Sequence, residues 1–392
     1  MDTDGFDRLE NRKGTASEKW DAADKLFHGH DLLPMWVADM DFQVPQEVTA
    51  ALERRIRHGI YGYTFRTESY FDAVRAWMKE HHDWTVRKEW ICHSPGVVTA
   101  LNLLVDGLTQ PGDKVLIQPP VYPLFRRSVS HQSRELVTNP LIYENGSYHM
   151  DFSDLEVKLA DPKVRMMILC SPHNPVGRVW TLDELTAVAR LAEKYHVLVV
   201  SDEIHGDLTY GAHHQIPFAG LSAYTASHSV VCTAPSKTFN LAGLQISNII
   251  IPDPQLRRIY LRQLGRFSLG SPNTLGVTAA EAAYRYGSSW LKACLGYIGG
   301  NADTVRSYID NDLPELSLVP LEGTYLAWID CRRLGLDKNE LREFMTDQAK
   351  LAVNPGDTFG KEGDGFIRLN LACPHSLVLQ AMGRLRKAVR AR

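Results

Sequence analysis

RMMILCSPHNPVG (165–177) starts as a short apolar run and continues as a polar loop, and the same layout recurs in VLVVSDEIH (197–205) and SVVCTAPSKTFNLAGLQ (229–245). Short apolar runs bounded by turn residues predict buried strands. Strands that alternate with helices, as they do through the middle of this chain, predict an α/β fold with a doubly wound sheet. Ligands bind such sheets beyond the carboxyl ends of the strands. We therefore expect the three polar loops to form one site.

A different reactive side chain follows each of the three runs: Asn174, Asp202 and Lys237. A pyridoxal-phosphate site needs one of each type. A lysine forms the Schiff base, an acid keeps the pyridine nitrogen protonated, and an amide donor meets the phenolate oxygen of the ring. The order of the three, with a spacing of roughly thirty residues, is more specific than any one of them. The sequence thus predicts pyridoxal phosphate as cofactor and Lys237 as the catalytic residue.

Each residue of the three loops also has a simpler interpretation. A lysine after a strand is usually solvated, but the small and apolar neighbours of Lys237 would desolvate its amine and lower its pKa. Asp202 alone would be a helix cap or a core ion pair, and a metal site with Glu203 and His205 lacks a second histidine cluster. Asn174 lies in an Asn-Pro turn motif. We expect His205 to share the phenolate oxygen with Asn174.

The cofactor's phosphate needs backbone amides and positive potential. Gly96, Val97 and Val98 open a helix predicted over 97–108, and the amides and dipole of a helix N-terminus form an anion site. Ser236 adds a hydroxyl. The chain contains neither of the glycine-rich loops typical of dinucleotide or nucleoside-triphosphate binding, so those alternatives lose their main support.

Two residues outside these loops suit the ring and the substrate. Tyr122 follows a predicted strand over 114–118 and either stacks on the cofactor ring or packs within its loop. Arg368 interrupts an apolar strand, so it is either paired internally or holds a substrate carboxylate through two parallel N–H bonds. An amino-acid substrate favours the second role for Arg368.

Periodicity predicts the remaining elements. Val48, Leu52 and Ile56 form an apolar stripe on a helix opened by Pro45. Past residue 315, strands mix with helices as in a small α+β domain. Further helices are predicted over 67–81, 181–195, 254–268, 273–286 and 288–311.

Composition narrows the class of protein. The 392 residues carry a formal net charge of −3, which leaves no basic field for nucleic acid. No apolar run approaches a membrane span, and the charged opening MDTDGFDRLENRKG predicts no secretory signal. Six cysteines without a Cys-x-x-Cys pair predict reduced thiols and a cytoplasmic protein. Three histidine pairs are interpreted as solvated or loop residues: His28/His30, His81/His82 and His213/His214.

These motifs together resemble the class I/II aminotransferase family of fold type I pyridoxal-phosphate enzymes, over nearly the whole chain. Within it, LPMWVADMDF (33–42), YGY (61–63) and SKTFNLAGLQ (236–245) are similar to the cystathionine β-lyase or cysteine-S-conjugate β-lyase branch. Many aminotransferases carry an arginine and a serine where this chain has Gln245 and Ala234. Both departures recur in the lyase branch.

The resemblance implies a fold and an assembly. It implies a large domain over 46–287, with a mainly parallel seven-stranded sheet between helices. A smaller α+β domain would join residues 1–45 to 288–392. Tyr63 would reach the phosphate of the other subunit's cofactor, which implies a homodimer with shared active sites.

The resemblance also implies a role for each site residue. Lys237 would hold the cofactor, Asp202 would face the pyridine nitrogen, and Asn174 would face the phenolate oxygen. Tyr122 would stack on the ring. Substrate-binding residues would be Arg368, Ala38 and Asp39.

The function expected from this resemblance is β-elimination. Lys237 would remove the α-proton of L-cystathionine or another cysteine S-conjugate, a thiolate would leave, and pyruvate and ammonia would follow. The main alternative is an aminotransferase acting on an amino acid and a keto acid. A cofactor-sensing transcription regulator is a rival of another class, but the chain has neither room nor positive charge for a DNA-binding domain.

Overall fold

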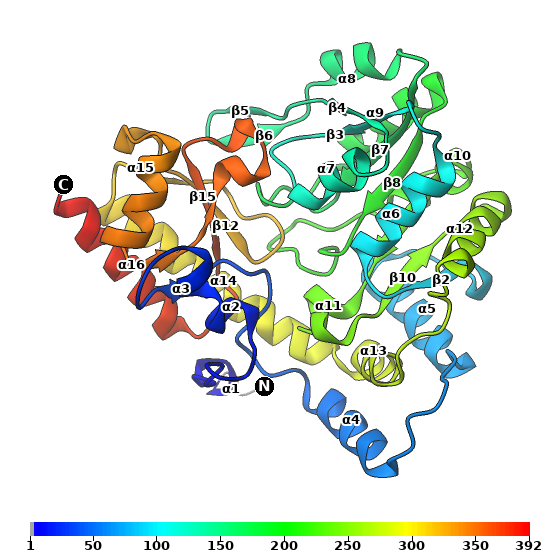
Figure 1. Ribbon diagram of the computed structural model, residues 1–392, viewed down its shortest axis with the longest axis horizontal. Helices are drawn as coiled ribbons and strands as arrows, with labels where there is room; N and C mark the ends of the chain where they lie inside the picture. The colour runs from blue at the N-terminus through cyan, green and yellow to red at the C-terminus, as the bar shows by residue number, and fades with distance from the viewer. Residues whose placement is uncertain (1–3) are drawn as a thin grey trace.

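A seven-stranded sheet forms the centre of the computed structural model, which describes residues 4–392 (Figure 1). The third to fifth strands in the spatial order are the three apolar runs that precede Lys237, Asp202 and Asn174. β10 runs antiparallel to both of its neighbours and the other pairings are parallel, which confirms the predicted mainly parallel sheet. The spatial order is β2 (Ile91–Ser94), β10 (Ser247–Ile250), β9 (Ser229–Thr233), β8 (Leu198–Asp202), β7 (Val164–Cys170), β3 (Lys114–Ile117) and β4 (Glu135–Thr138).

Helices cover both faces of this sheet, so its strands are apolar on both sides. Along β7, Met166 and Ile168 belong to a core with α6, α7 and α12, whereas Met167 and Leu169 belong to a core with α8 and α9. This alternation follows from the two-residue period of a strand. These helices are α6 (Val97–Leu108), α7 (Pro123–Ser130), α8 (Phe152–Leu159), α9 (Leu182–Tyr195) and α12 (Pro254–Arg266).

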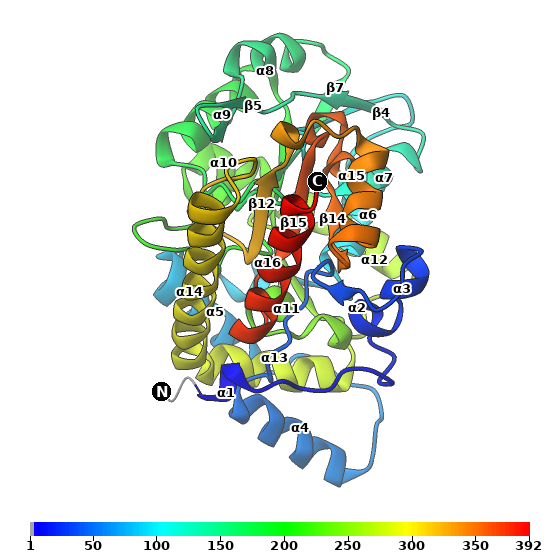
Figure 2. The same ribbon diagram turned by 90° about the vertical axis from the view of Figure 1, so that its left-hand side faces the viewer.

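A second, antiparallel sheet of four strands packs beside the first. Its order is β11 (Ser317–Leu318), β12 (Leu326–Asp330), β15 (Phe366–Asn370) and β14 (Asn354–Pro355). The helices of this part of the chain are α14 (Ser288–Asp312), α15 (Lys338–Glu343) and α16 (His375–Arg390), and α14 packs against α16 (Figure 2).

The N-terminal segment lies against this C-terminal part. β1 (Leu33–Pro34) pairs in parallel with β13 (Leu351–Ala352), and the blue and red ends of the chain lie on one side of the molecule (Figure 1). This pairing agrees with a small domain built from both ends of the chain. The domain limits at residues 45 and 287 stay a prediction. The other short elements are α1 (Asp4–Asp7), α2 (Glu18–Asp21), α3 (Ala23–Leu26), β5 (Ile142–Glu144), β6 (Ser147–His149), α10 (Ala223–Ser227) and α11 (Pro235–Thr238).

Most of the predicted helices are present within a few residues of their expected limits. α5 (Glu68–His82) and α13 (Thr274–Tyr286) match their periodic segments, and α9 begins with the predicted capping box of Thr181 and Glu184. The apolar stripe predicted on α4 (Gln46–His58) is not buried to its end, because Ile56 is 51% exposed. α4 packs on α13 by one face and projects from the body of the molecule (Figure 2).

The interpretation of His82 as a solvated residue is wrong. Its side chain is only 8% exposed, and its Nε2 lies 2.7 Å from a carboxylate oxygen of Asp207. The neighbouring His81 stacks on Trp77 with the ring centroids 3.6 Å apart. Sequence could not show this, because the last turn of α5 is buried by a loop more than a hundred residues away.

Two findings bear on the predictions from composition. Within residues 4–392, every helix is too short or too polar to cross a membrane. All six cysteines are buried and free.

A buried ion cluster fixes the N-terminal segment. Asp41 accepts hydrogen bonds from the ammonium of Lys19 (2.6 Å), the indole of Trp20 (2.8 Å) and the guanidinium of Arg12 (2.7 Å). Lys19 is fully buried. Burial alone would raise the pKa of Asp41, but the charge of Lys19 and these donors outweigh it and lower the pKa below its ordinary value of 3.8.

Asp41→Ala should lower the free energy of unfolding by about 3–5 kcal/mol, because Lys19 would stay buried without its partner. Urea unfolding measures the change. Asp83→Asn is the matched control, since the Asp83–Lys79 pair is exposed and its loss should leave the free energy of unfolding nearly unchanged. The stabilisation by Asp41 should be complete above pH 3.8 and decline as the pH falls through its lower folded-state pKa. Equal losses in the two variants would contradict this account.

Candidate active site

A cavity of about 400 Å³ lies where β7, β8 and β9 end. It collects most of the residues that the sequence predicts, although they come from seven separate segments. The cavity is lined by the predicted residues Ala38, Gly96, Val97, Val98, Tyr122, Asn174, Asp202, His205, Ser236, Lys237 and Arg368.

Lys237 lies on α11, directly after β9. Its Nζ donates a hydrogen bond of 2.6 Å to the backbone oxygen of Ala38. Burial, and then the positive charge of Arg368, lower its pKa from 10.5 to about 8. A sizeable fraction of the amine is therefore uncharged near neutral pH, as a nucleophile or a general base requires.

Asp202 is the last residue of β8 and lies inside the same cavity. Burial raises its pKa from 3.8 to about 7, although the amide of Ile204 and the charge of Lys237 act in the opposite direction. Among residues 4–392, the carboxylate accepts one hydrogen bond, from the backbone amide of Ile204 at 3.2 Å. A buried carboxylate with a single hydrogen-bond donor is poorly stabilised, and a cationic N–H group bound beside it would stabilise its charge.

Arg368 on β15 reaches the cavity from the second sheet. Its guanidinium donates to Asn174 Oδ1 (2.9 Å), to Asn354 Oδ1 (2.6 Å) and to the carbonyl of Trp36 (3.0 Å), and it lies over the ring of Phe359. Burial lowers its pKa from 12.5 to about 10. The sequence analysis missed Asn354. The two-residue strand β14 has no periodicity, and only the register of β14 on β15 sets Asn354 opposite Arg368.

The opposite end of the cavity suits an anion. Gly96 precedes α6 in an extended conformation without a side-chain cap, and the first turn of α6 contains no acidic residue. Its amides therefore face the cavity with the positive end of the helix dipole. Ser236, Gln245 and Ser247 line the same cavity, and Ser247 is a residue that the sequence analysis missed.

His205 and Tyr122 complete the lining. Burial, followed by the charges of Lys237 and Arg368, lowers the pKa of His205 well below 6.5, so its ring is neutral. Its Nδ1 is buried without a hydrogen-bond partner among residues 4–392. Burial and the charge of Asp202 raise the pKa of Tyr122, which keeps its phenol protonated.

These residues fit pyridoxal phosphate. The under-supported carboxylate of Asp202, the low pKa of Lys237, the free amides of α6 and the orphaned nitrogen of His205 are each matched by a group of that cofactor. The metal alternative fits less well, because Glu203 turns away to accept from Ser201 Oγ and the amide of Phe218. No cluster of three metal-ligating side chains occurs within residues 4–392.

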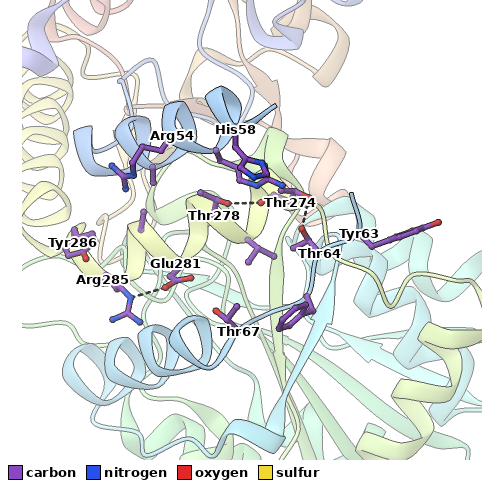
Figure 3. A pocket seen from close by; sticks show the side chains of 15 residues that line it. Arg54, His58, Tyr63, Thr64, Thr67, Thr274, Thr278, Glu281, Arg285 and Tyr286 are labelled. Atoms are coloured by element: carbon purple, nitrogen blue, oxygen red, sulfur yellow. Dashed lines mark hydrogen bonds and ion pairs between the residues drawn. The ribbon is translucent and has the colours of Figure 1, made fainter. Parts of the chain in front are cut away.

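Two predicted residues lie outside this cavity. Asp39 forms a two-pronged ion pair with Arg12 (2.6 and 3.2 Å), which holds its carboxylate away from the cavity. Tyr63 is fully exposed and lines a separate groove of about 720 Å³ between α4 and α13. Figure 3 shows its ring pointing away from α13.

Fold and site together define an α/β enzyme that presents a buried lysine and a buried carboxylate at the carboxyl edge of its sheet. The family "Aminotransferase class I and II" matches residues 31–385. The chain belongs to this family, as its motifs predicted.

The relatives agree with the predicted branch. The chain is 45% identical to "Cystathionine beta-lyase PatB" of Bacillus subtilis (strain 168), over 98% of this chain and 99% of that protein. It is 34% identical to "Protein MalY" of Escherichia coli (strain K12), with the same shares covered. The structure of cystalysin from Treponema denticola, which contains pyridoxal 5'-phosphate, matches with a TM-score of 0.96 and 37% identity over 98% of this chain and 99% of that chain.

Lys237→Met should raise the free energy of unfolding of the cofactor-free protein at pH 7, by up to about 3 kcal/mol from a pKa lowered from 10.5 to about 8. The folded protein binds fewer protons than the unfolded chain between these pH values. The wild type therefore gains stability as the pH rises from 8 to 10.5, and the advantage of the variant should shrink. Urea unfolding at pH 7 and pH 10 measures both effects.

The matched control for this prediction is Lys13→Met, at an exposed lysine. It should change the free energy of unfolding by less than about 0.5 kcal/mol. A Lys237→Met protein that is no more stable than the wild type at pH 7 would contradict the burial of a costly charge.

Proposed function

We propose that this protein is a pyridoxal-phosphate-dependent carbon–sulfur β-lyase. It cleaves L-cystathionine or other cysteine S-conjugates to a thiol, pyruvate and ammonia. The observation that carries the proposal is that Lys237, Asp202 and Arg368 line one cavity, in a chain that is 45% identical to a relative named as a cystathionine β-lyase.

The residues that would hold the cofactor lie around the cavity in a fixed order. Lys237 would bind its carbonyl carbon, Asp202 would face its ring nitrogen, and Asn174 with His205 would face its phenolate oxygen. The amides at Gly96, Val97 and Val98, with the hydroxyl of Ser236, would hold the phosphate, and Tyr122 would contact the ring. When bound, pyridoxal phosphate supplies an electron-withdrawing ring that stabilises negative charge at the substrate's α-carbon.

Arg368 binds the α-carboxylate of the substrate. Its Nη1 donates to Asn174 and its Nη2 to the carbonyl of Trp36, whereas its Nε is buried without a hydrogen-bond partner among residues 4–392. Asn354 and the ring of Phe359 hold the guanidinium plane in place. Ala38 borders the same region. A planar, pre-oriented guanidinium binds a carboxylate with two parallel hydrogen bonds.

Lys237 moves the proton. Once the substrate's amino group has displaced Lys237 from the cofactor, the freed amine, with a pKa of about 8, would accept the α-proton of the substrate at Nζ. The carbonyl of Ala38, 2.6 Å from Nζ, then stabilises the resulting ammonium and keeps it close to the reacting carbons. Loss of the β-thiolate completes the elimination, and water then hydrolyses the remaining aminoacrylate to pyruvate and ammonia. Lys237 or a nearby tyrosine hydroxyl returns a proton to the departing sulfur.

The assembly we propose is a homodimer in which Tyr63 binds the phosphate of the partner's cofactor. Large exposed apolar side chains follow one another over the end of α4 and the segment after it: Ile56, Ile60, Tyr61, Tyr63 and Phe65. Tyr63 and Phe65 line the groove between α4 and α13. A patch of this kind marks an interaction surface. Gln245 is uncharged, so a hydroxyl from another subunit would strengthen the binding of the phosphate. Six buried free thiols suit the cytoplasm, where we place the protein.

The proposed reaction predicts sustained pyruvate production from L-cystathionine by the cofactor-loaded protein without any keto acid. Pyruvate, ammonia and homocysteine should form in equal amounts over many turnovers, as followed with a coupled lactate dehydrogenase assay. Lys237→Ala should lower kcat by at least roughly 1,000-fold. A single turnover that resumes only after a keto acid is added would instead identify an aminotransferase.

The shared site predicts complementation between two inactive variants. Tyr63→Ala and Lys237→Ala proteins, mixed and reassembled, should regain about one quarter of wild-type activity, because half of the dimers are mixed and each contains one intact site. Lys237→Ala mixed with itself is the control. Mixtures that stay inactive, although mass spectrometry shows mixed dimers, would exclude Tyr63 as a residue of the partner's site.

A further inference from the structure

The loop that follows β8 has two functional faces. Asp202 and His205 face the cavity, whereas Asp207 turns to the back of the loop. There its carboxylate accepts hydrogen bonds from Thr238 Oγ1 (2.6 Å) and from the indole of Trp77 (2.9 Å), and His82 Nε2 lies 2.7 Å away. One carboxylate thus joins α5, the loop after β8 and the end of α11.

Thr238 is the residue after Lys237 and the last residue of α11. A helix of four residues without a side-chain cap has little stability of its own. Side-chain anchors therefore have to hold the backbone of Lys237. Asn240 supplies one anchor by bonding the backbone of residues 40 and 42, and Asp207 supplies the other through Thr238.

We propose that Asp207, paired with His82, is a positioning residue that fixes the loop of Lys237 against the loop of Asp202 through the hydroxyl of Thr238. The inference rests on the proposed function, because Asp207 would set the distance between Lys237 and Asp202, the two residues that would contact the cofactor. No atom of Asp207 lines the catalytic cavity, so it acts through its neighbours.

The charge state of the pair suits this role. Burial acts against ionisation of both groups. The hydrogen bond and charge of His82, together with the donors of Thr238 and Trp77, nevertheless lower the pKa of Asp207. The hydrogen bond and charge of Asp207 likewise raise the pKa of His82. Charge-assisted hydrogen bonds of this kind are shorter and stronger than neutral ones. Other charged or titratable groups around His82 are Glu203, whose charge also raises its pKa, and His81, His214 and Lys292, which line a small cavity beside it.

Thr238→Val tests the proposal, because it removes the hydroxyl while keeping the shape of the side chain. We expect kcat for the β-lyase reaction to fall roughly 10- to 100-fold with KM nearly unchanged, since displacement of a reacting group by about 1 Å has that effect. Thr238→Ser, which keeps the hydroxyl, should retain most of the activity. Thr109→Val is the matched control, because Thr109 is a buried, hydrogen-bonded threonine at the far end of α6.

A second readout does not depend on turnover. Added pyridoxal phosphate reacts with the uncharged amine of Lys237 in the cofactor-free protein and gives a visible absorption band. In the wild type, the rate of this reaction should have a pH midpoint near the lysine pKa of about 8. Thr238→Val should raise the midpoint toward 10.5, because a loosened loop lets the amine reach water. His82→Gln should raise it in the same direction.

A purely structural role for Asp207 would give a different result. Thr238→Val and Thr109→Val would then lower the melting temperature alike, while kcat per folded site and the pH midpoint stay at their wild-type values. That outcome, or an unchanged midpoint in both Thr238→Val and His82→Gln, would overturn the proposal. A wild-type protein that forms no visible band would instead refute the proposed function.

Discussion

The carbonyl oxygen of Ala38 is the acceptor on which the site depends. It accepts hydrogen bonds from Lys237 Nζ (2.6 Å) and from the hydroxyl of Tyr325 (2.8 Å). Lys237 comes from the large sheet and Tyr325 precedes β12 of the small one, so both halves of the molecule meet at this atom. The extended segment 36–42 has no strand beside it, and its backbone must find other partners. Side chains supply them: Arg368 bonds residue 36, Asn370 bonds residues 37 and 39, and Asn240 bonds residues 40 and 42.

This arrangement gives a physical reason for the motif WVADMDF. The carbonyl oxygens of Trp36 and Ala38 accept hydrogen bonds from the site residues Arg368 and Lys237, and Asp41 anchors the segment to the buried Lys19. Only Ala38 of the predicted pair Ala38 and Asp39 lines the catalytic cavity, since Asp39 is bound to Arg12. The motif thus forms the wall of the cavity that Lys237 and Arg368 contact. The motif is therefore typical of the branch for the backbone that it provides as much as for side chains that act on the substrate.

The cavity concentrates charges that oppose folding. Burial lowers the pKa of both Lys237 and Arg368, and the charge of Arg368 lowers that of Lys237 further. Burial raises the pKa of Asp202, whose carboxylate has little hydrogen-bond support. Such groups are stabilised only when a ligand supplies the missing partners. Two carboxylates outside the cavity stabilise the fold instead: Asp41 and Asp207 each have three hydrogen-bonding partners. A pre-organised site requires reactive groups that line the cavity and, outside it, fully hydrogen-bonded side chains that hold their segments in place.

The sequence by itself determined the sheet, the order of its polar loops and the position of Asn174, Asp202 and Lys237 at its carboxyl edge, because strand period, helix caps and turn residues are local properties. α6 and the capping box of α9 are where local signals placed them. Only the tertiary structure decided the surroundings of His82, the exposure of Ile56 and the position of Asn354 opposite Arg368. These depend on which distant segment packs against a given residue, and a burial of that kind has no period along the chain.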